Sequence, residues 1–266
     1  MASFSVVTNV AANNAQANLY ATNVGLKSAL NRVSSGFRIN YSGDDAAGLA
    51  VANGHRSAVA VLTQGVRNAN DGLSDLQIKD GALDNVSKLL DRLSTLATQA
   101  ASGQTTDTSR TTLNQEFQDV LSEINRESSV ASLDSSQGFS VFVSNNGSNG
   151  VVGGTIGAVT TTSLGITGDL TSQANAQASV AAIATGVNTL GSVQGQVGQL
   201  QNRLSYAISL AQSQIVNTKA AESRIRDANI AEESANLTRF NILNQSGIAA
   251  LAQANGQTSA VLSLLR

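Results

Sequence analysis

The sequence predicts a mainly α-helical protein, a long antiparallel coiled-coil or helical-bundle rod that carries a small β-hairpin element and has its N- and C-terminal helices paired at one end. Its 266 residues include no proline. Because proline removes a backbone N–H donor and clashes with the preceding turn, its absence is typical of long uninterrupted helices. Apolar residues recur at helical spacing before and after a middle stretch of strand-like alternation, which places the hairpin between two helical halves.

Residues 1–43 are expected to form the N-terminal helix and a connecting segment. Apolar and small side chains recur at helical spacing among many Asn, Ser and Ala residues, a pattern that predicts a weakly amphipathic helix. A break follows from Gly36 to Gly43. Asp44 and Asp45 then indicate a helix start, since a carboxylate there accepts from free backbone N–H groups and lies at the positive end of the helix dipole.

Residues 44–130 are expected to form the N-terminal helices of the rod. A heptad-like apolar seam predicts one helix from Asp44 to Ala100, much longer than the globular mean of about 10–14 residues. A polar turn over 102–109 leads into a shorter helix, which should fold back antiparallel. The seam of the long helix is formed by Leu62, Val66, Ala69, Leu73, Leu76, Leu83, Val86, Leu90, Leu93 and Ala97.

Residues 131–175 differ in composition from the flanking segments. They are rich in Gly, Ser, Thr and Val, and only Asp134 and Asp169 are charged. Alternation over 139–143 and an Asn-Gly turn signal predict a small β-hairpin. Helical spacing returns over 176–221, which predicts the C-terminal helix of the rod, and a last helix is expected over 222–266.

The two terminal helices contain few bulky apolar residues and many Ala, Gly, Ser, Asn and Gln residues. Such surfaces pack closely in an assembly but stabilise an isolated helix pair only weakly. We therefore expect other copies of the chain to complete them, which predicts a self-assembling structural subunit. The alternative from a different class is a monomeric extracellular helical adhesin or binding module.

Composition argues against nucleic acid and metal as partners. A formal net charge of −2 gives no electrostatic attraction for nucleic acid or an anionic lipid surface. The chain has no cysteine and a single histidine, His55, so it lacks a thiolate or multi-histidine metal set and a cysteine–histidine pair. We expect no metal and no cofactor.

Two sequence patterns resemble catalytic features but fit structural roles better. Asp44-Asp45 follows a glycine at a helix start, which fits capping better than acid–base catalysis. Three glycines lie inside the helical repeat with no strand before them, so close helix packing explains them better than a phosphate loop. We therefore expect no enzyme activity and no small-molecule substrate. The glycines are Gly191, Gly195 and Gly198.

The sequence also bears on the route out of the cell. The first residues lack a basic region followed by an apolar core, so no cleaved secretory leader is expected. No stretch reaches about eighteen consecutive apolar residues, so we expect no membrane span. An extracellular subunit of this kind would leave by a route that reads no cleaved leader.

Several segments are similar to the N- and C-terminal signatures of bacterial flagellin, over roughly residues 1–130 and 176–266 and in the correct order. The N-terminal segments are Leu30-Asn-Arg-Val-Ser-Ser-Gly-Phe-Arg-Ile-Asn40, Ser42-Gly-Asp-Asp-Ala-Ala-Gly-Leu-Ala-Val51 and Arg67-Asn-Ala-Asn-Asp-Gly-Leu73. The C-terminal segments are Gln201-Asn-Arg-Leu204, Ser223-Arg-Ile-Arg-Asp-Ala-Asn-Ile-Ala-Glu-Glu233, Leu251-Ala-Gln-Ala-Asn255 and Leu264-Leu265-Arg266.

The resemblance implies a subunit that polymerises into an extracellular flagellar filament for swimming motility. Residues 1–43 and 222–266 would form an inner, channel-lining domain, and 44–130 with 176–221 a rod domain. The short middle implies a filament with a smooth, thin outer surface. Candidate polymer-contact residues within the signatures are Arg32, Asp44, Asp45, Asn68, Asn70, Asp71, Arg224, Asp227, Gln253, Asn255, Leu264 and Leu265.

The resemblance also implies partners other than the chain itself. These are a flagellar export chaperone, the filament cap and the junction proteins, with export of the unfolded chain through the flagellar type III apparatus. The alternative within the same class is the hook–filament junction protein, which has similar termini. Its members diverge more strongly from the Ser34-Ser35-Gly36 and Asp-Asp-Ala-Ala-Gly patterns.

One further motif resembles the site that the animal Toll-like receptor for flagellin recognises. Arg92, Leu96 and Glu116 match that motif as candidate receptor contacts. The arginine and glutamate that the family has between the first two are replaced by Ser94 and Thr95. These departures argue against full-strength recognition by the receptor.

Overall fold

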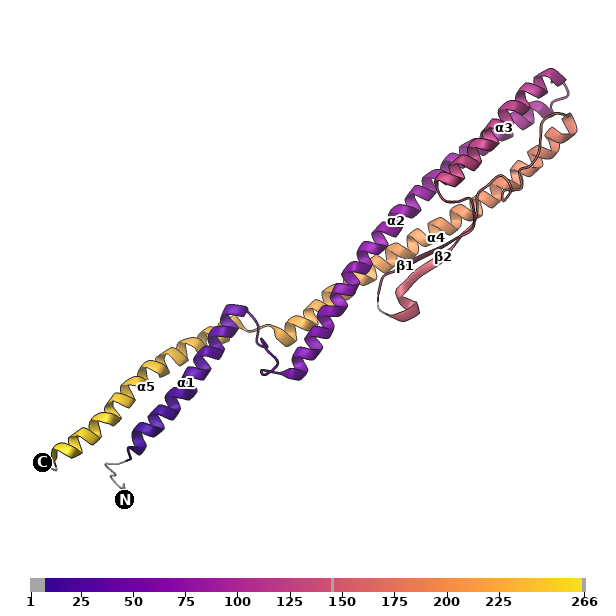
Figure 1. Cartoon of the computed structure of the whole chain (residues 1–266). Helices are drawn as coiled ribbons and strands as arrows, with labels where there is room; N and C mark the ends of the chain where they lie inside the picture. Colours follow the sequence, from indigo (N-terminus) through magenta and orange to yellow (C-terminus); the bar gives the residue numbers. More distant parts are fainter. Residues whose placement is uncertain (1–7, 145, 265–266) are drawn as a thin grey trace. The chain divides into compact units, whose positions relative to one another are not determined.

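The computed structural model describes residues 8–144 and 146–264, with backbone alone at Ser148 and from residue 257 onward. Its elements divide between two compact units. One contains the residues up to Ser57 together with those from Asn217 onward, and the other contains Ala58–Val216. In chain order the elements are α1 (Val10–Ser35), α2 (Ala46–Ala101), α3 (Asp107–Val130), β1 (Gln137–Phe142), the 3-10 helix η1 (Gly147–Gly150), β2 (Val151–Ile156), α4 (Gln173–Arg226) and α5 (Ile230–Leu264) (Figure 1).

The predicted fold class is confirmed: long helices frame one small antiparallel hairpin in the described part of the chain. The start of the second helix lies slightly later than expected, at Ala46. Asp45 caps it, since its Oδ1 accepts from the Gly48 N–H at 2.8 Å. Asp44 instead accepts from two backbone N–H groups of the preceding turn, those of Asn40 at 3.1 Å and Tyr41 at 3.3 Å.

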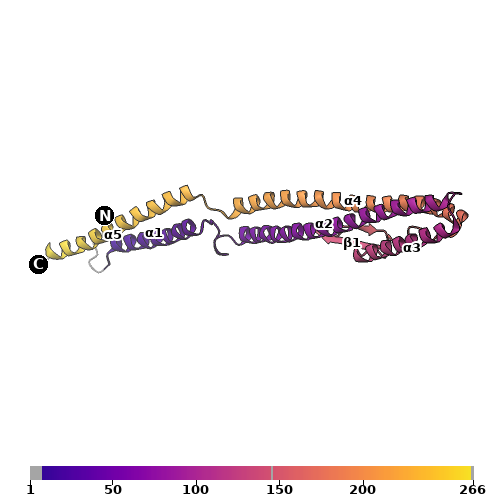
Figure 2. The same cartoon turned by 90° about the horizontal axis from the view of Figure 1, so that it is seen from above.

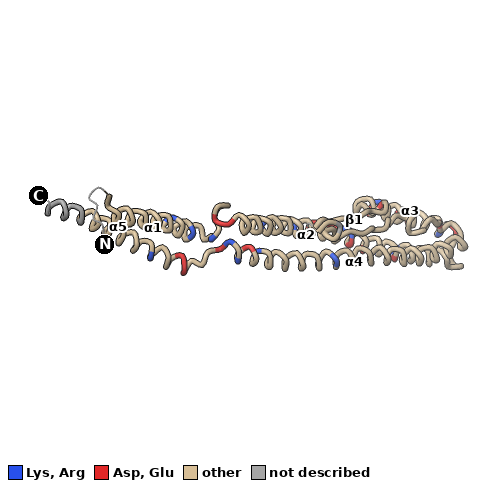
Figure 3. The backbone as a smooth tube through the Cα atoms, turned by 90° about the horizontal axis from the view of Figure 1, so that it is seen from below, with Lys and Arg blue, Asp and Glu red and all other residues tan. Residues whose placement is uncertain are grey.

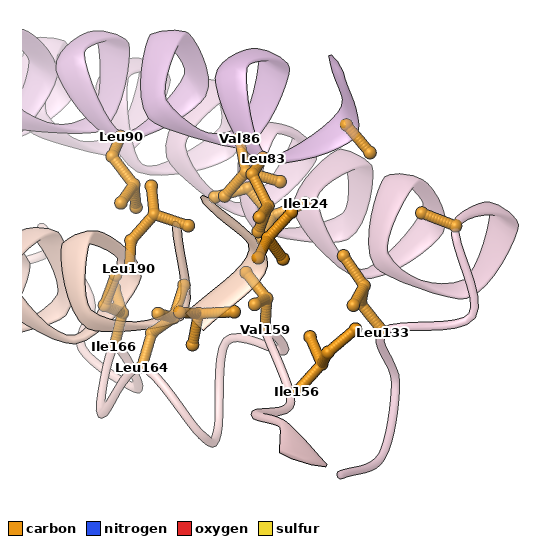
Figure 4. Close-up of a cluster of buried hydrophobic side chains, with 14 of the residues drawn as sticks. Leu83, Val86, Leu90, Ile124, Leu133, Ile156, Val159, Leu164, Ile166 and Leu190 are labelled. Carbon is orange, nitrogen blue, oxygen red and sulfur yellow. The ribbon is translucent and has the colours of Figure 1, made fainter. Parts of the chain in front are cut away.

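The core of the 58–216 unit is continuous and aliphatic. The helical seam predicted from the sequence supplies one side of it, and Leu76, Leu83 and Leu90 are fully buried. α3 folds back antiparallel on α2, as expected, because Arg92 contacts Glu116 while Asn85, earlier in α2, contacts Glu127 later in α3. In Figure 4, side chains of α2, α3, α4 and the middle segment meet; those labelled are Leu83, Val86, Leu90, Ile124, Leu133, Ile156, Val159, Leu164, Ile166 and Leu190.

The middle segment is a hairpin followed by an irregular return of the chain. β1 and β2 pair antiparallel, with Gln137 opposite Ile156 and Phe142 opposite Val151. A glycine of α2 allows the hairpin to approach closely, because a Cβ on Gly65 would overlap with the Val143 carbonyl oxygen. After β2 the chain returns to α4 with apolar side chains buried in the core, at Val159, Leu164, Ile166 and Leu170.

The helix expected over 176–221 is longer at both ends. α4 begins at Gln173, where the Ser172 hydroxyl accepts from the Asn175 N–H at 3.2 Å, and it runs to Arg226. The last helix accordingly starts at Ile230. Residues 222–226, expected in the terminal helix, therefore belong to α4.

α1 and α5 form an antiparallel pair in the other unit (Figure 2). Three hydrogen bonds along the pair show its direction, since the residue numbers in α5 fall as those in α1 rise. The Asn9 side chain donates to the Ala254 carbonyl at 2.9 Å, the Asn244 amide donates to Asn23 Oδ1 at 2.6 Å, and Arg32 donates to Glu233 at 3.1 Å. Small residues lie against large ones, since a Cβ on Gly25 would lie 2.6 Å from the Phe240 ring. The predicted pairing of the terminal helices is thus observed.

Candidate assembly surfaces

The terminal helix pair exposes most of its large apolar side chains. In the described residues of this unit, the buried apolar side chains are few: Ala29, Ile39 and Ala52. The large exposed ones on α1 and α5, with their exposed fractions, are Val10 61%, Tyr20 73%, Val24 52%, Leu30 54%, Ile230 47%, Ile242 61%, Leu243 46% and Ile248 55%. The pair therefore carries apolar area that its own two helices do not cover.

The exposed faces are also poor in charge. α1 carries only Lys27 and Arg32, and the described side chains of α5 only Glu232, Glu233 and Arg239, so most of both helices is neutral in Figure 3. Neutral faces with many small residues allow close approach of another helix without desolvating ionised groups. This combination suits contact with further copies of the chain.

Two breaks between helices lie side by side next to the helix pair. Residues 36–39 pair with 226–228: the Arg38 N–H donates to the Arg226 carbonyl at 2.7 Å and the Ala228 N–H to the Gly36 carbonyl at 2.9 Å. Phe37 forms an isolated antiparallel bridge with Asp227, and the Arg226 guanidinium lies over the Phe37 ring, 4.1 Å from its centroid. Gly36 ends α1 at φ +74°, a left-handed conformation that glycine adopts without strain. The two breaks are therefore one fixed junction.

The signature residues of this unit are only partly brought together. Arg32 and Asp44 line one hollow of about 260 Å³ between the end of α1 and the 40–44 turn, together with Lys27 and Tyr41. Arg32 also pairs with Glu233 on α5.

Two further signature residues lie in the last turn of α4 and directly after it. Asp227 accepts from the Ser223 hydroxyl at 2.6 Å. Arg224 is exposed in the last turn of the helix. Neither residue lines the hollow that Arg32 and Asp44 share.

A second group of signature residues lies in the 58–216 unit, on α2. Asn68 fastens the hairpin, because its Nδ2 donates to the Phe142 carbonyl at 3.2 Å while its Oδ1 accepts from Gln64 at 2.8 Å. Asn70 donates to the Val66 carbonyl at 3.0 Å within the helix. Asp71 is exposed. Asn68 therefore has a role inside the subunit, and Asp71 presents its carboxylate to solvent.

Of the remaining signature residues, Gln253, Asn255 and Leu264 lie along α5. Gln253 and Asn255 are exposed. The backbone of Leu264 ends the described part of α5, and Leu265 lies outside the described residues.

The receptor-like motif is split between surface and core. Arg92 and Glu116 join α2 to α3 through a surface ion pair, with Arg92 Nε 2.8 Å from Glu116 Oε1. Leu96 points into the core and is 1% exposed. Of the three residues, only Arg92 and Glu116 are therefore presented at the surface.

Some positioning residues were not found from the sequence. The junction is fixed by the contact between Phe37 and Arg226, and the helix pair by the contact of Glu233 with Arg32. The partners of each contact lie roughly 190–200 positions apart in the chain. One local signal could have pointed to Glu233. It lies beside Glu232 in the first turn of α5, a place where the helix dipole favours negative charge.

The described residues contain neither a metal cluster nor a membrane-spanning helix. No group of three or more His, Cys, Asp or Glu residues among them is placed to hold a metal ion. None of the helices, as far as they are described, has the length and apolar character needed to cross a membrane.

Comparison with known proteins gives two family matches and many full-length relatives. Residues 6–140 match the bacterial flagellin N-terminal helical region, and residues 180–265 match the bacterial flagellin C-terminal helical region. The chain is 37% identical to a flagellin of Halalkalibacterium halodurans, 32% to flagellin FlaB1 of Treponema pallidum and 32% to flagellar filament core protein flaB2 of Brachyspira hyodysenteriae. Each of these alignments covers 97% of this chain and 98% of the relative.

Proposed function

The chain belongs to the bacterial flagellin family, and from this premise we propose how the subunit is built into its filament. As a flagellin it is a structural subunit of the flagellar filament, which lies outside the cell. We assign it a purely structural role. The proposal concerns which surfaces make the polymer and in what order they form.

The α1–α5 pair is the inner, channel-lining part of the assembled subunit. The observation that carries this assignment is the contrast in burial: Leu76, Leu83 and Leu90 of the 58–216 unit are fully buried, whereas Tyr20 and Ile242 of the terminal pair are 73% and 61% exposed. Burying these apolar side chains against several neighbouring copies stabilises the polymer at about 25 cal/mol per Å² of apolar surface removed from water.

The terminal helices reach their final order when an incoming subunit docks at the filament tip. Ordering a helix costs backbone entropy of about 1–2 kcal/mol per residue, and the α1–α5 pair offsets little of this alone because it buries few large side chains. Contacts with neighbouring copies supply the missing burial. The unit with the continuous core, in contrast, folds without neighbours.

We infer the export route and the proteins that contact the filament ends from the family. We propose that the chain passes unfolded through the flagellar type III apparatus without a cleaved leader. An export chaperone binds it before export, and the cap and junction proteins contact the filament ends. The absence of cysteine suits passage of an unlinked, extended chain.

Seeded polymerisation tests the proposal. Purified chain is heated to dissociate it, cooled with or without short filament seeds, and imaged by negative-stain electron microscopy. Long uniform filaments growing from the seeds are expected. Chain that stays monomeric, with α1 and α5 protected from hydrogen exchange, would contradict the proposal and favour a monomeric binding module.

A matched pair of variants tests the surface itself. Ile242→Ser removes an exposed apolar side chain from α5, and Gln245→Ser changes an exposed polar one on the same helix. We expect Ile242→Ser to slow seeded growth while the unfolding midpoint of the free chain stays unchanged. Equal growth rates for the two variants would show that this face of α5 makes no contact in the polymer.

A further inference from the structure

The chain contains four Asn-Gly pairs, which begin at Asn53, Asn146, Asn149 and Asn255. In such a pair the glycine backbone nitrogen can attack the asparagine side-chain carbonyl carbon, because glycine has no side chain to hinder the approach. A new C–N bond closes a five-membered succinimide, the bond from that carbon to the amide nitrogen breaks, and ammonia leaves. Water then opens the ring at either carbonyl, giving aspartate or isoaspartate without any oxidant or reductant.

Two of the four pairs are protected by helices. Asn53 lies inside α2 and Asn255 inside α5. In a helix the following N–H donates to the carbonyl four residues earlier, and ψ is fixed near about −42°. Ring closure requires the backbone nitrogen of the glycine to turn toward the asparagine side chain, so the helix must open first.

The pair at Asn149 is held by the hairpin connection. Gly150 is buried, and its carbonyl accepts from the N–H groups of Val143 at 2.8 Å and Ser144 at 3.2 Å. A Cβ on Gly150 would overlap with the Ser144 carbonyl oxygen, which shows how closely the two backbones approach. The Gly150 nitrogen therefore cannot move toward Asn149 without breaking this contact.

The pair at Asn146 is held less firmly: the Asn149 N–H donates to the Asn146 carbonyl at 3.2 Å, but neither an α-helix nor a close backbone contact fixes the pair in the described structure. Asn146 lies outside any helix or strand, between the end of β1 at Phe142 and the start of η1 at Gly147. Gly147 is exposed, has φ +59°, and has no atom of the described residues within 4 Å of where a Cβ would stand. It is the first residue of η1, and the first N–H groups of a helix have no partner within it.

We propose that Asn146 is a site of spontaneous deamidation in this protein. The product adds a carboxylate to residues 131–175, whose only charged side chains are Asp134 and Asp169, and lowers the formal net charge of −2 by one. A subunit outside the cell is separated from intracellular repair, so the product accumulates as the filament ages. The isoaspartate form also adds one carbon to the backbone of the connection, which loosens the hydrogen bonds of Val143 and Ser144 to Gly150.

Quantitative peptide mass spectrometry tests the proposal on purified chain and on filaments kept in mildly alkaline buffer. We expect Asn146 to be converted at least about tenfold faster than Asn53 in both samples, and at least about tenfold faster than Asn255 in filaments, where α5 has its final order, because the reaction at Asn146 needs no helix opening. Isoaspartate should exceed aspartate, as detected by labelling with an isoaspartyl methyltransferase. Chain unfolded in urea serves as the reference in which all four pairs react at comparable rates.

Two variants act as controls. Asn146→Gln should abolish the signal, since a glutamine closes its ring much more slowly. Gly147→Asn keeps a residue that tolerates positive φ and should slow the reaction without removing Asn146. Conversion of Asn53 as fast as Asn146 in the folded free chain, or of Asn255 as fast as Asn146 in filaments, would overturn the proposal, as would an Asn146 that stays intact in folded chain while reacting in urea. Deamidation of Asn146 in free chain but not in filaments would contradict the proposal that the product accumulates as the filament ages.

Discussion

Arg32 Nη1 lies 3.1 Å from Glu233 Oε1 and joins the end of α1 to the start of α5. The two side chains are 32% and 12% exposed, so the pair is partly shielded from water. Arg32 Nε is buried without a hydrogen-bond partner in the described structure. The carboxylate of Glu233 is therefore the main compensation for bringing this guanidinium into the helix interface.

Removing that carboxylate should loosen the helix pair. Glu233→Gln is expected to cost about 1–2 kcal/mol in the local stability of α1 and α5, measured by hydrogen exchange of their amides in assembled filaments, where both helices have their final order. Asp84→Asn is the control, because Asp84 and Lys88 form an exposed pair, 65% and 69% accessible, whose loss should cost less than about 0.5 kcal/mol. The charge-reversed double variant, Arg32→Glu with Glu233→Arg, should recover part of the lost stability. Unchanged hydrogen exchange in Glu233→Gln would show that the ion pair does not stabilise the helix pair.

Gly65 and Gly81 form a matched pair of glycines on α2. A Cβ on Gly65 would overlap with the Val143 carbonyl oxygen, whereas one on Gly81 meets nothing within 4 Å. Gly65→Ala should therefore displace the hairpin and lower the free energy of unfolding by about 1–3 kcal/mol. Gly81→Ala should raise it by about 1 kcal/mol, since alanine favours a helix over glycine. Urea denaturation measures both, and equal effects would contradict the close approach of the hairpin.

Long repeats made the main helices predictable from sequence. The seam from Leu62 to Ala97 contains many turns of the same pattern, so α2 was located almost to its ends. Its start was misplaced because the sequence cannot say which of two adjacent carboxylates caps the helix. In the structure Asp45 does so, while Asp44 accepts from the turn before it.

Long-range contacts explain the features that local patterns do not predict. The boundary between α4 and α5 falls after Arg226 because residues 226–228 pair with 36–39, a contact that no local pattern reports. For the candidate site, the signature supplied Arg32 but not its partner Glu233, which lies 201 positions away. The return segment after β2 was likewise hidden, since Leu164, Ile166 and Leu170 are buried without regular alternation.

Asp169 should titrate below the ordinary carboxyl value of 3.8. Its pKa is lowered first by the hydrogen bond from the Asn175 side chain at 2.8 Å, and then by those from the Thr171 hydroxyl and N–H at 2.7 and 3.0 Å. A lowered pKa in the folded state means a stabilising contribution that is present above pH 3.8 and is lost as the pH falls through the folded pKa. Asn175→Ala should move the pKa of Asp169 back up, as measured by NMR titration of the carboxyl carbon; Asn85→Ala, on another helix, should leave it unchanged.

The receptor-like motif should give less than full-strength signalling. Leu96 is buried, Arg92 and Glu116 are already paired with each other, and Ser94 and Thr95 replace the arginine and glutamate of the family's motif. An activation assay on cells expressing the animal Toll-like receptor for flagellin checks this expectation. Replacing Ser94 by Arg and Thr95 by Glu together should raise the response, and full-strength signalling by the unchanged chain would contradict the prediction.

Deleting Val261–Arg266 should abolish polymerisation while leaving the 58–216 unit folded. The reason is the division of burial: the core of that unit contains Leu76, Leu190 and Leu204, all far from the deletion in the sequence, whereas α5 exposes Ile242 and Ile248 for other copies to cover. The thermal unfolding transition of the core should be unchanged, and seeded growth in the electron microscope should stop. Filaments of normal length from the shortened chain would show that the end of α5 is dispensable, and the polymer contacts would then have to lie nearer the junction of residues 36–39 and 226–228.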